Sequence, residues 1–352
     1  MAERYVFRPL AGRMLIGFVI SVWLGGSAFA DPDEVRILGR SAPIEGGGFA
    51  LQWAASGFEA HVVGKSLTAT VFDESGENWL NVEVDGQRSA LQLKRGAADY
   101  VLFSGKPGSH IVRVTRRTNS QGGVMRLLAI RSDGAIAPTA TPKRHMLVIG
   151  DSITSGYGVE GADQHCRYTK ATQNADRAYP ALAARSFAAD LELVAMDGWG
   201  LTPNSQGSSS TMKQMAWQTL PSDPTPWPHS KSSPQVIVVA LGTNDFANGD
   251  VGIAFAADYV AFIRKLRGAY KKAHIFGVFG GMLDGERYLA GRAAVSAAIG
   301  KLRQAGDDRI HFIEFTPPDA PRRWGCDWHP GLDAQQYMAR TLQTQISKYV
   351  AW

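Results

Sequence analysis

Hydrophobic positions follow two different rhythms along the chain. In the first third, short runs alternate apolar and polar side chains, at 66–72, 79–87, 110–118 and 125–132. A period of two predicts β-strands with one buried face. Asp85 and Gly86 follow one run as a strong hairpin-turn signal, and glycine-bearing turns recur between the runs. Residues 31–132 are therefore predicted to form a β-sandwich, jelly-roll-like in type.

The rhythm changes after a small, proline-bearing stretch, 133–143, which we expect to be a linker. Apolar runs typical of buried parallel strands occupy 145–150, 191–196, 236–241, 274–280 and 310–315. Helical spacing of three or four marks 254–270, and similar patterns lie near 178–189, 286–304 and 333–349. The predicted fold class is α/β, with a five-stranded parallel sheet over 144–352 preceded by the smaller β-sandwich.

The first thirty residues have the features of a secretory signal peptide. Arg4, Arg8 and Arg13 precede the apolar run 14–24, and the segment ends in "AFA" at 28–30. The alternative is a membrane anchor, but a spanning helix needs about 20 apolar residues. We expect cleavage after Ala30, a secreted or periplasmic protein, and no integral membrane segment once the signal is removed.

Charge and cysteine content indicate which partners, disulfides and metal sites the sequence allows. The full chain carries a formal charge of +5, part of it in the predicted signal, and shows no run of like charge. We therefore expect no nucleic-acid partner, and a monomer. In an exported chain, Cys166 and Cys326 are expected to form a disulfide, with two buried thiols as the alternative. No further pair has metal-ligand spacing, so no metal or cofactor is expected.

Polar residues gather where the predicted parallel strands end, which is where such sheets bind ligands. Ser152 follows the first strand, and "CDWHP" at 326–330 follows the last. A serine needs a base to become a nucleophile, and His329 is the candidate. If its segment is extended, Asp327 lies on the same side and orients the imidazole.

The other strand ends supply candidate donors for an oxyanion hole. These are the backbone N–H of Ser152, that of Gly198 or Gly200 in "MDGWG" (196–200), and the side-chain amide of Asn244 in "LGTND" (241–245). Taken singly, Ser152 is equally a helix cap and Asn244 a turn residue. Their joint placement at successive strand ends favours catalysis.

At these motifs the chain resembles the SGNH hydrolases, also called the GDSL-type esterase superfamily. The resemblance rests on "GDSI" (150–153), "DGWG", "GTND" (242–245) and "DWHP". It implies Ser152 as nucleophile, His329 as base and Asp327 as orienter. The whole chain is similar to carbohydrate esterase family two, which are exported acetylesterases with an N-terminal β-sandwich. Asp197, where a smaller residue is expected, and "HPGLDAQ" after the histidine depart from that pattern.

Gly156, Gly158 and Gly161 spell the G-x-G-x-x-G spacing of dinucleotide-binding sites. In such sites the strand runs directly into the first glycine. Here the strand is expected to end at Gly150, so the glycines are predicted to shape a loop beside the serine instead.

Trp199 and Trp328 adjoin the predicted catalytic groups, where they either stack on sugar rings or pack their own loops. Trp217 or Trp227, in the Ser- and Pro-rich stretch 205–234, either walls the cleft or belongs to ordinary surface loop. We expect an exported esterase that removes O-acetyl groups from an acetylated polysaccharide or oligosaccharide through an acetyl-enzyme. The alternatives are a lipase or thioesterase for longer acyl chains, and a catalytically silent carbohydrate-binding protein.

Overall fold

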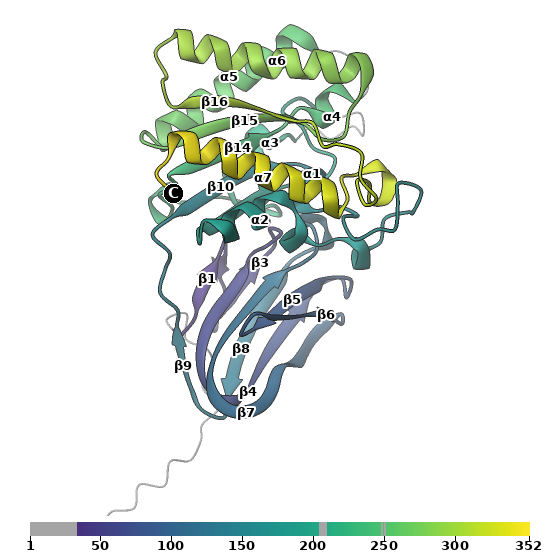
Figure 1. The fold of residues 1–352 in the computed structure, drawn as a ribbon. Coiled ribbons are helices and arrows are strands. Elements are labelled where there is room, and N and C mark those ends of the chain that lie inside the picture. The colour runs from purple at the N-terminus through teal and green to yellow at the C-terminus, as the bar shows by residue number, and fades with distance from the viewer. Residues whose placement is uncertain (1–33, 204–209, 248, 250) are drawn as a thin grey trace, which may run out of the picture.

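The computed structural model describes residues 34–203, 210–247, 249 and 251–352. The predicted signal peptide lies outside these residues. Figure 1 shows a β-rich domain at one end of the molecule and stacked helix and sheet layers at the other. None of the helices in the described part of the chain is long and apolar enough to cross a bilayer.

The β-rich domain is one nine-stranded sheet built around two long, paired strands, β4 and β7. Its strands are β1 (Arg36–Leu38), β2 (Ala42–Pro43), β3 (Phe49–Leu51), β4 (Gly57–Asp73), β5 (Trp79–Val84), β6 (Gln87–Gln92), β7 (Gly96–Arg116), β8 (Met125–Ser132) and β9 (Ala135–Pro138). The β-rich domain expected from the alternating pattern is confirmed.

An irregularity in β4 keeps both halves of this strand facing one core. Phe58, Ala60 and Val62 are buried at even positions, whereas Leu67 and Val71 are buried at odd ones. The parity changes at a register shift between Gly64 and Ser66. Because side chains alternate across a strand, one extra residue is enough to turn the second half over. All five side chains therefore join the same hydrophobic cluster.

The predicted linker contains a strand. Residues 135–138 form β9, which pairs with Ala60–Val63 of β4. This pairing uses backbone groups and leaves most side chains exposed, so it produces no hydrophobic period that the sequence could show.

The second region is a five-stranded parallel sheet, as the five apolar runs predicted, and its strand order is β11-β10-β14-β15-β16. Its strands are β10 (His145–Gly150), β11 (Asp190–Ala195), β14 (Val236–Ala240), β15 (His274–Gly280) and β16 (Ile310–Phe315). The helices are α1 (Ser152–Ser155), α2 (Tyr179–Ser186), α3 (Met212–Met215), α4 (Thr243–Phe246), α5 (Gly252–Ala269), α6 (Gly285–Gln304) and α7 (Leu332–Tyr349). A two-stranded hairpin, β12 (Gln218–Leu220) and β13 (Asp223–Pro226), lies outside the sheet.

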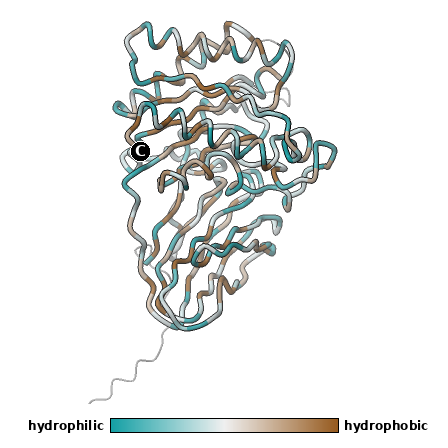
Figure 2. The backbone as a smooth tube through the Cα atoms, in the orientation of Figure 1, coloured by the Kyte–Doolittle hydropathy of each residue, from teal (hydrophilic) through white to brown (hydrophobic). Residues whose placement is uncertain are grey.

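Helices cover both faces of this sheet. Met146 and Val148 of β10 pack in one cluster with residues of α2 and α7, while Leu147 and Ile149 pack in another with residues of α5 and α6. Figure 2 shows hydrophobic stretches along the strands between these helices. Buried on both faces, the sheet presents its loops at the carboxyl edge, where the predicted site residues lie.

The two regions are joined by buried contacts. Trp53, which is fully buried, belongs to the hydrophobic cluster of the α/β domain, and its indole N–H donates to the Thr219 carbonyl over 2.9 Å. Arg40 bonds Glu192 of β11 at 2.7 Å and also donates to the carbonyls of Ala216 and Gln218. These side chains of the β-rich domain therefore form part of the interior of the α/β domain.

Candidate active site

Ser152 and His329, which are 177 residues apart in sequence, meet at the carboxyl edge of the parallel sheet. The Ser152 Oγ lies 2.9 Å from the His329 Nε2. Ser152 is the first residue of α1, immediately after β10. Asp151 caps this helix, since its carboxylate accepts from the Ile153 N–H at 3.0 Å. The capping role considered for Ser152 thus belongs to its neighbour, and the serine hydroxyl is directed at the imidazole.

The hydrogen bonds around His329 determine which ring nitrogen carries the proton. Nδ1 lies 3.0 Å from the main-chain carbonyl oxygen of Asp327. A carbonyl only accepts, so Nδ1 must donate, which leaves the lone pair of Nε2 for the Ser152 hydroxyl. Burial lowers the pKa of His329 to about 4, so the ring is neutral near neutral pH. This is the state that a general base requires.

The Asp327 carboxylate does not face the imidazole, contrary to the role predicted for it. It accepts instead from the Tyr157 hydroxyl at 3.1 Å and from the Tyr168 N–H at 3.0 Å. The prediction assumed an extended segment, but Cys326–Trp328 form a tight turn in which Asp327 and Trp328 have φ of 51° and 60°. This turn rotates the Asp327 carbonyl toward His329 and its side chain away.

Asn244 bridges the loops that follow β10 and β11. From α4, its Nδ2 lies 3.1 Å from the Trp199 carbonyl and 3.3 Å from the Asp151 carboxylate. Burial is the main cause that raises the pKa of Asp151, to about 7. The contacts with Trp199 and Asp151 hold the Asn244 amide at the same edge of the parallel sheet as Ser152.

The two candidate glycines differ in their surroundings. A Cβ at Gly200 would overlap the Asp245 carboxylate, whereas one at Gly198, where φ is +78°, would meet no atom within 4 Å. Asp245 accepts from the backbone N–H groups of Leu201 and Thr202, so it ties the loop after β11 to α4. Gly200 is thus packed into this junction, and Gly198 borders open space.

A buried polar cluster lies beneath the Gly198 loop, and the sequence analysis missed most of it. The Asp197 carboxylate accepts from the Ser155 hydroxyl at 2.6 Å and from the amide of Asn119. Burial raises the pKa of Asp197. Asn119 belongs to the β-rich domain, as does Gln121, whose amide donates to the Asp197 carbonyl at 3.0 Å. Asp197 stood out as a departure from the resembling family, but no sequence signal marked its partners.

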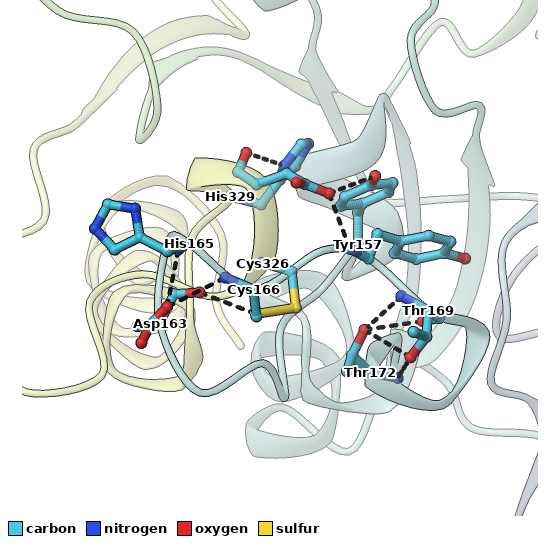
Figure 3. Close-up of a disulfide and its surroundings, with 10 residues drawn as sticks. Tyr157, Asp163, His165, Cys166, Thr169, Thr172, Cys326 and His329 are labelled. Carbon is cyan, nitrogen blue, oxygen red and sulfur yellow. Dashed lines mark hydrogen bonds between the residues drawn. A yellow bond between two sulfur atoms is a disulfide. The ribbon is translucent and has the colours of Figure 1, made fainter.

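A disulfide joins Cys166 to Cys326, three residues before His329 (Figure 3). The glycine-rich segment wraps this bond. A Cβ at Gly158 would contact Cys326, and one at Gly161 would overlap both sulfurs. The glycines therefore serve close packing beside the histidine turn, as the loop interpretation of the G-x-G-x-x-G spacing predicted.

The four candidate tryptophans lie in different surroundings. Trp328 is 51% exposed and lies edge-on to Trp324, with ring centroids 5.6 Å apart, at a cleft of about 370 Å³ at the ends of β15 and β16. Trp199 packs against the hydrophobic cluster of the α/β domain. Trp217 is half-buried against Phe262, and Trp227 is buried beneath Arg40; neither lines the cleft that Trp328 borders.

Comparison with known families follows the same division of the chain. Residues 148–337 match the GDSL-like lipase/acylhydrolase family, and residues 37–142 match the carbohydrate esterase 2 N-terminal domain. The chain belongs to the GDSL-like lipase/acylhydrolase family. It is a carboxylic ester hydrolase, and the resemblance to family two carbohydrate esterases is confirmed.

Similar proteins and structures cover nearly all of this hydrolase. It is 32% identical to the cellulase/esterase CelE of Acetivibrio thermocellus across 92% of its own length, and spans 40% of that relative. An acetylxylan esterase / glucomannan deacetylase of Cellvibrio japonicus is 29% identical, with 95% of this chain and 97% of the relative covered. A family two carbohydrate esterase of Clostridium thermocellum, in complex with cellohexaose, superposes with a TM-score of 0.87 at 30% identity, covering 90% of this chain and 99% of the other.

Proposed function

We propose that this protein is an exported esterase that removes O-acetyl groups from a polysaccharide or oligosaccharide. The observation that carries the proposal is the 2.9 Å contact between the Ser152 Oγ and the His329 Nε2, with Nδ1 committed as a donor to a carbonyl. The acetyl and glycan specificity is supported by relatives named acetylxylan esterase / glucomannan deacetylase. Export is supported by the basic start, apolar run and "AFA" of residues 1–30.

The proposed reaction begins with attack by Ser152. Its Oγ forms a bond to the acetyl carbon as Nε2 of His329 takes the hydroxyl proton, and the carbonyl electrons move onto oxygen. The C–O bond to the sugar then breaks, and the imidazolium returns its proton to the departing sugar oxygen. Water attacks the acetyl-enzyme with the same proton transfers, releasing acetate and restoring the serine.

Three donors are proposed for the oxyanion: the N–H of Ser152, the N–H of Gly198 and Nδ2 of Asn244. The Asn244 amide keeps its bond to the Trp199 carbonyl and turns its other hydrogen from Asp151, 3.3 Å away, to the oxyanion. Gly198 is preferred over Gly200 because Gly200 is packed against Asp245. Each such donor acts where charge develops in the transition state, so its loss lowers kcat.

The cleft lined by Trp328, the residue before His329 in the chain, suits a sugar ring. Trp328 presents an exposed aromatic face there, and Trp324 and Tyr288 line the same space. Flat aromatic surfaces with polar neighbours are typical of sites for ligands that are apolar on one face and polar at the edge. We assign Trp328 to glycan contact, and Trp199 to packing and to orienting Asn244 through its carbonyl.

Acetate release by the chain from residue 31 onward tests the proposal. Ser152→Ala should lower the rate on acetylated xylan or glucomannan by at least about 10⁴-fold. The control, Ser89→Ala in the exposed strand β6, should leave it unchanged. Nitrophenyl acetate should be cleaved faster than nitrophenyl octanoate. Retained acetate release in Ser152→Ala would overturn the catalytic assignment, octanoate preference would favour the lipase alternative, and glycan binding without turnover would favour the silent binding protein.

A further inference from the structure

The aromatic ring of Tyr157 covers one face of the proposed base. The ring centroids of Tyr157 and His329 are 4.1 Å apart with an interplanar angle of 33°. Figure 3 shows both rings beside the disulfide. Tyr157 follows α1, five residues after Ser152, so the segment that presents the nucleophile also presents this ring.

The contact matters because, among the residues that the structure describes, no carboxylate is hydrogen-bonded to the imidazole. When Nε2 takes the serine proton, the ring becomes a cation, and Ser-His-Asp sites stabilise that cation with a buried carboxylate. Here the Asp327 carboxylate is bonded to Tyr157 and Tyr168 and acts on the ring only through space, while Nδ1 donates to a neutral carbonyl. Burial lowers the pKa of His329 to about 4, so the neutral site disfavours the cation that the reaction must form.

The face of an aromatic ring attracts a cation directly, although the ring itself is uncharged. The π-system is negative above and below the ring, and it attracts a cation within about 6 Å of the centroid, most strongly where water is excluded. The 4.1 Å between the ring centroids is within this distance. Because the two ring planes are inclined by only 33°, Tyr157 presents its face, and not its edge, to His329.

Tyr157 is held firmly in this position. Tyr168 stacks on it with ring centroids 4.0 Å apart and an interplanar angle of 16°. The phenol donates to the Asp327 carboxylate, and burial together with that carboxylate raises the pKa of Tyr157, so the phenol stays protonated. The Asp327 N–H bonds the Cys166 carbonyl at 3.0 Å, and the disulfide joins the two segments covalently.

We propose that Tyr157 is a positioning residue that orients His329 and stabilises its imidazolium form through the face of its ring, in the place a carboxylate takes in a triad. Asp327 acts one step further out, by anchoring the phenol. The proposal rests on the proposed function, since it requires His329 to accept the Ser152 proton. It assigns Tyr157 no contact with the ester.

The test compares side chains of matched shape at position 157. Phenylalanine keeps the ring, 3,4,5-trifluorophenylalanine keeps the shape but weakens the negative face, and leucine removes the ring. Tyr157→Phe should keep kcat for nitrophenyl acetate within about threefold. The trifluoro variant should lower kcat a further few-fold, and Tyr157→Leu should lower it within the two- to thirtyfold range of a desolvated cation–π contact, with KM nearly unchanged.

Two controls separate the possible outcomes. Tyr349→Phe, in a tyrosine that stacks on His311 outside the proposed site, should retain the full rate, and thermal unfolding of each variant reports folding. Equal kcat for the phenylalanine and trifluoro variants would overturn the proposal, even if the leucine variant does not fold. If Ser152→Ala keeps its activity, the proposed function fails and this inference fails with it. If Ser152→Ala is inactive while the two ring variants are equal, only the inference fails.

Discussion

Asp327 holds His329 through its main-chain carbonyl, 3.0 Å from Nδ1, and turns its carboxylate toward Tyr157. The pair has the D-x-H spacing of a catalytic triad but the contacts of a dyad. The proton arrangement on the imidazole is therefore fixed by backbone geometry, which no side-chain substitution at position 327 removes directly.

Replacing Asp327 with asparagine should consequently cost little. Asparagine tolerates the left-handed conformation at this position and still offers an oxygen to the Tyr168 N–H. We expect kcat for nitrophenyl acetate to fall less than about tenfold, whereas the same change in a carboxylate-dependent triad costs about 10⁴-fold. Steady-state kinetics of Asp327→Asn decide between the two arrangements, and a loss of 10³ or more would restore the triad.

The rate should remain high in mild acid. His329 is active when neutral, and burial lowers its pKa to about 4, so kcat/KM should be level above that value and fall below it. An unperturbed histidine would place the fall near pH 6.5. Acetate release between pH 3.5 and 8 measures the midpoint, and a midpoint of 6 or above would contradict the expectation.

The free energy of unfolding must be measured in the same experiment, because the lowered pKa of His329 also makes stability depend on pH. Unfolded His329 binds a proton below about pH 6.5 and the folded form only below about 4. This residue's contribution to the free energy of unfolding is thus present above pH 6.5 and is lost as the pH falls toward 4. Circular dichroism at each pH separates inactivation by protonation from unfolding.

Asn244→Ala tests the oxyanion hole. Both Nδ2 hydrogens bond protein acceptors, the Trp199 carbonyl at 3.1 Å and the Asp151 carboxylate at 3.3 Å, so the oxyanion takes the hydrogen of the longer contact. Removing one such donor typically lowers kcat by 10²–10³-fold. KM should change little. Asn244→Asp, which has nearly the same shape but brings a negative charge to the oxyanion, should be at least as slow. An alanine variant within threefold of wild type would remove Asn244 from the mechanism.

The sequence predicted the meeting of Ser152 and His329 for a general reason. Both follow strands of one parallel sheet, and the carboxyl ends of such strands share an edge. Periodicity also located α5, α6 and α7 to within two residues, because their buried faces repeat every three or four positions.

Features that depend on contacts between distant parts of the chain could not be predicted from the sequence. The left-handed turn at Asp327 is tied to Cys166, 161 residues earlier in the chain, through the Cys166 carbonyl and the disulfide to Cys326. Asn119 and Gln121 reach Asp197 from the other domain, and polar loop residues carry no period that would reveal a partner. Local patterns specify elements, whereas these contacts exist only once the two domains are packed together.

Opening the disulfide should loosen both the fold and the histidine turn. A cross-link over a loop of this size contributes about 2–5 kcal/mol. Cys166→Ser with Cys326→Ser should lower the free energy of unfolding by that amount and reduce kcat, because the turn that aims the Asp327 carbonyl loses its covalent tie. Urea titrations with and without dithiothreitol compare wild type with the double variant, and wild-type kinetics insensitive to complete reduction would contradict the link to activity.

Breaking the buried ion pair between Arg40 and Glu192 should lower the free energy of unfolding far more than breaking an exposed pair. Both side chains are nearly inaccessible, and Arg40 also satisfies two carbonyls of the α/β domain. Arg40→Met leaves the buried Glu192 carboxylate with the imidazole of His145 at 3.8 Å in place of a guanidinium at 2.7 Å, and should lower the free energy of unfolding by about 3–5 kcal/mol. The matched control is Arg88→Met, whose partner Glu83 lies at the same 2.7 Å but at the surface, where such pairs contribute about 1 kcal/mol or less. Urea unfolding followed by tryptophan fluorescence measures both, and equal effects would show that the contact between the domains adds nothing to the stability of the fold.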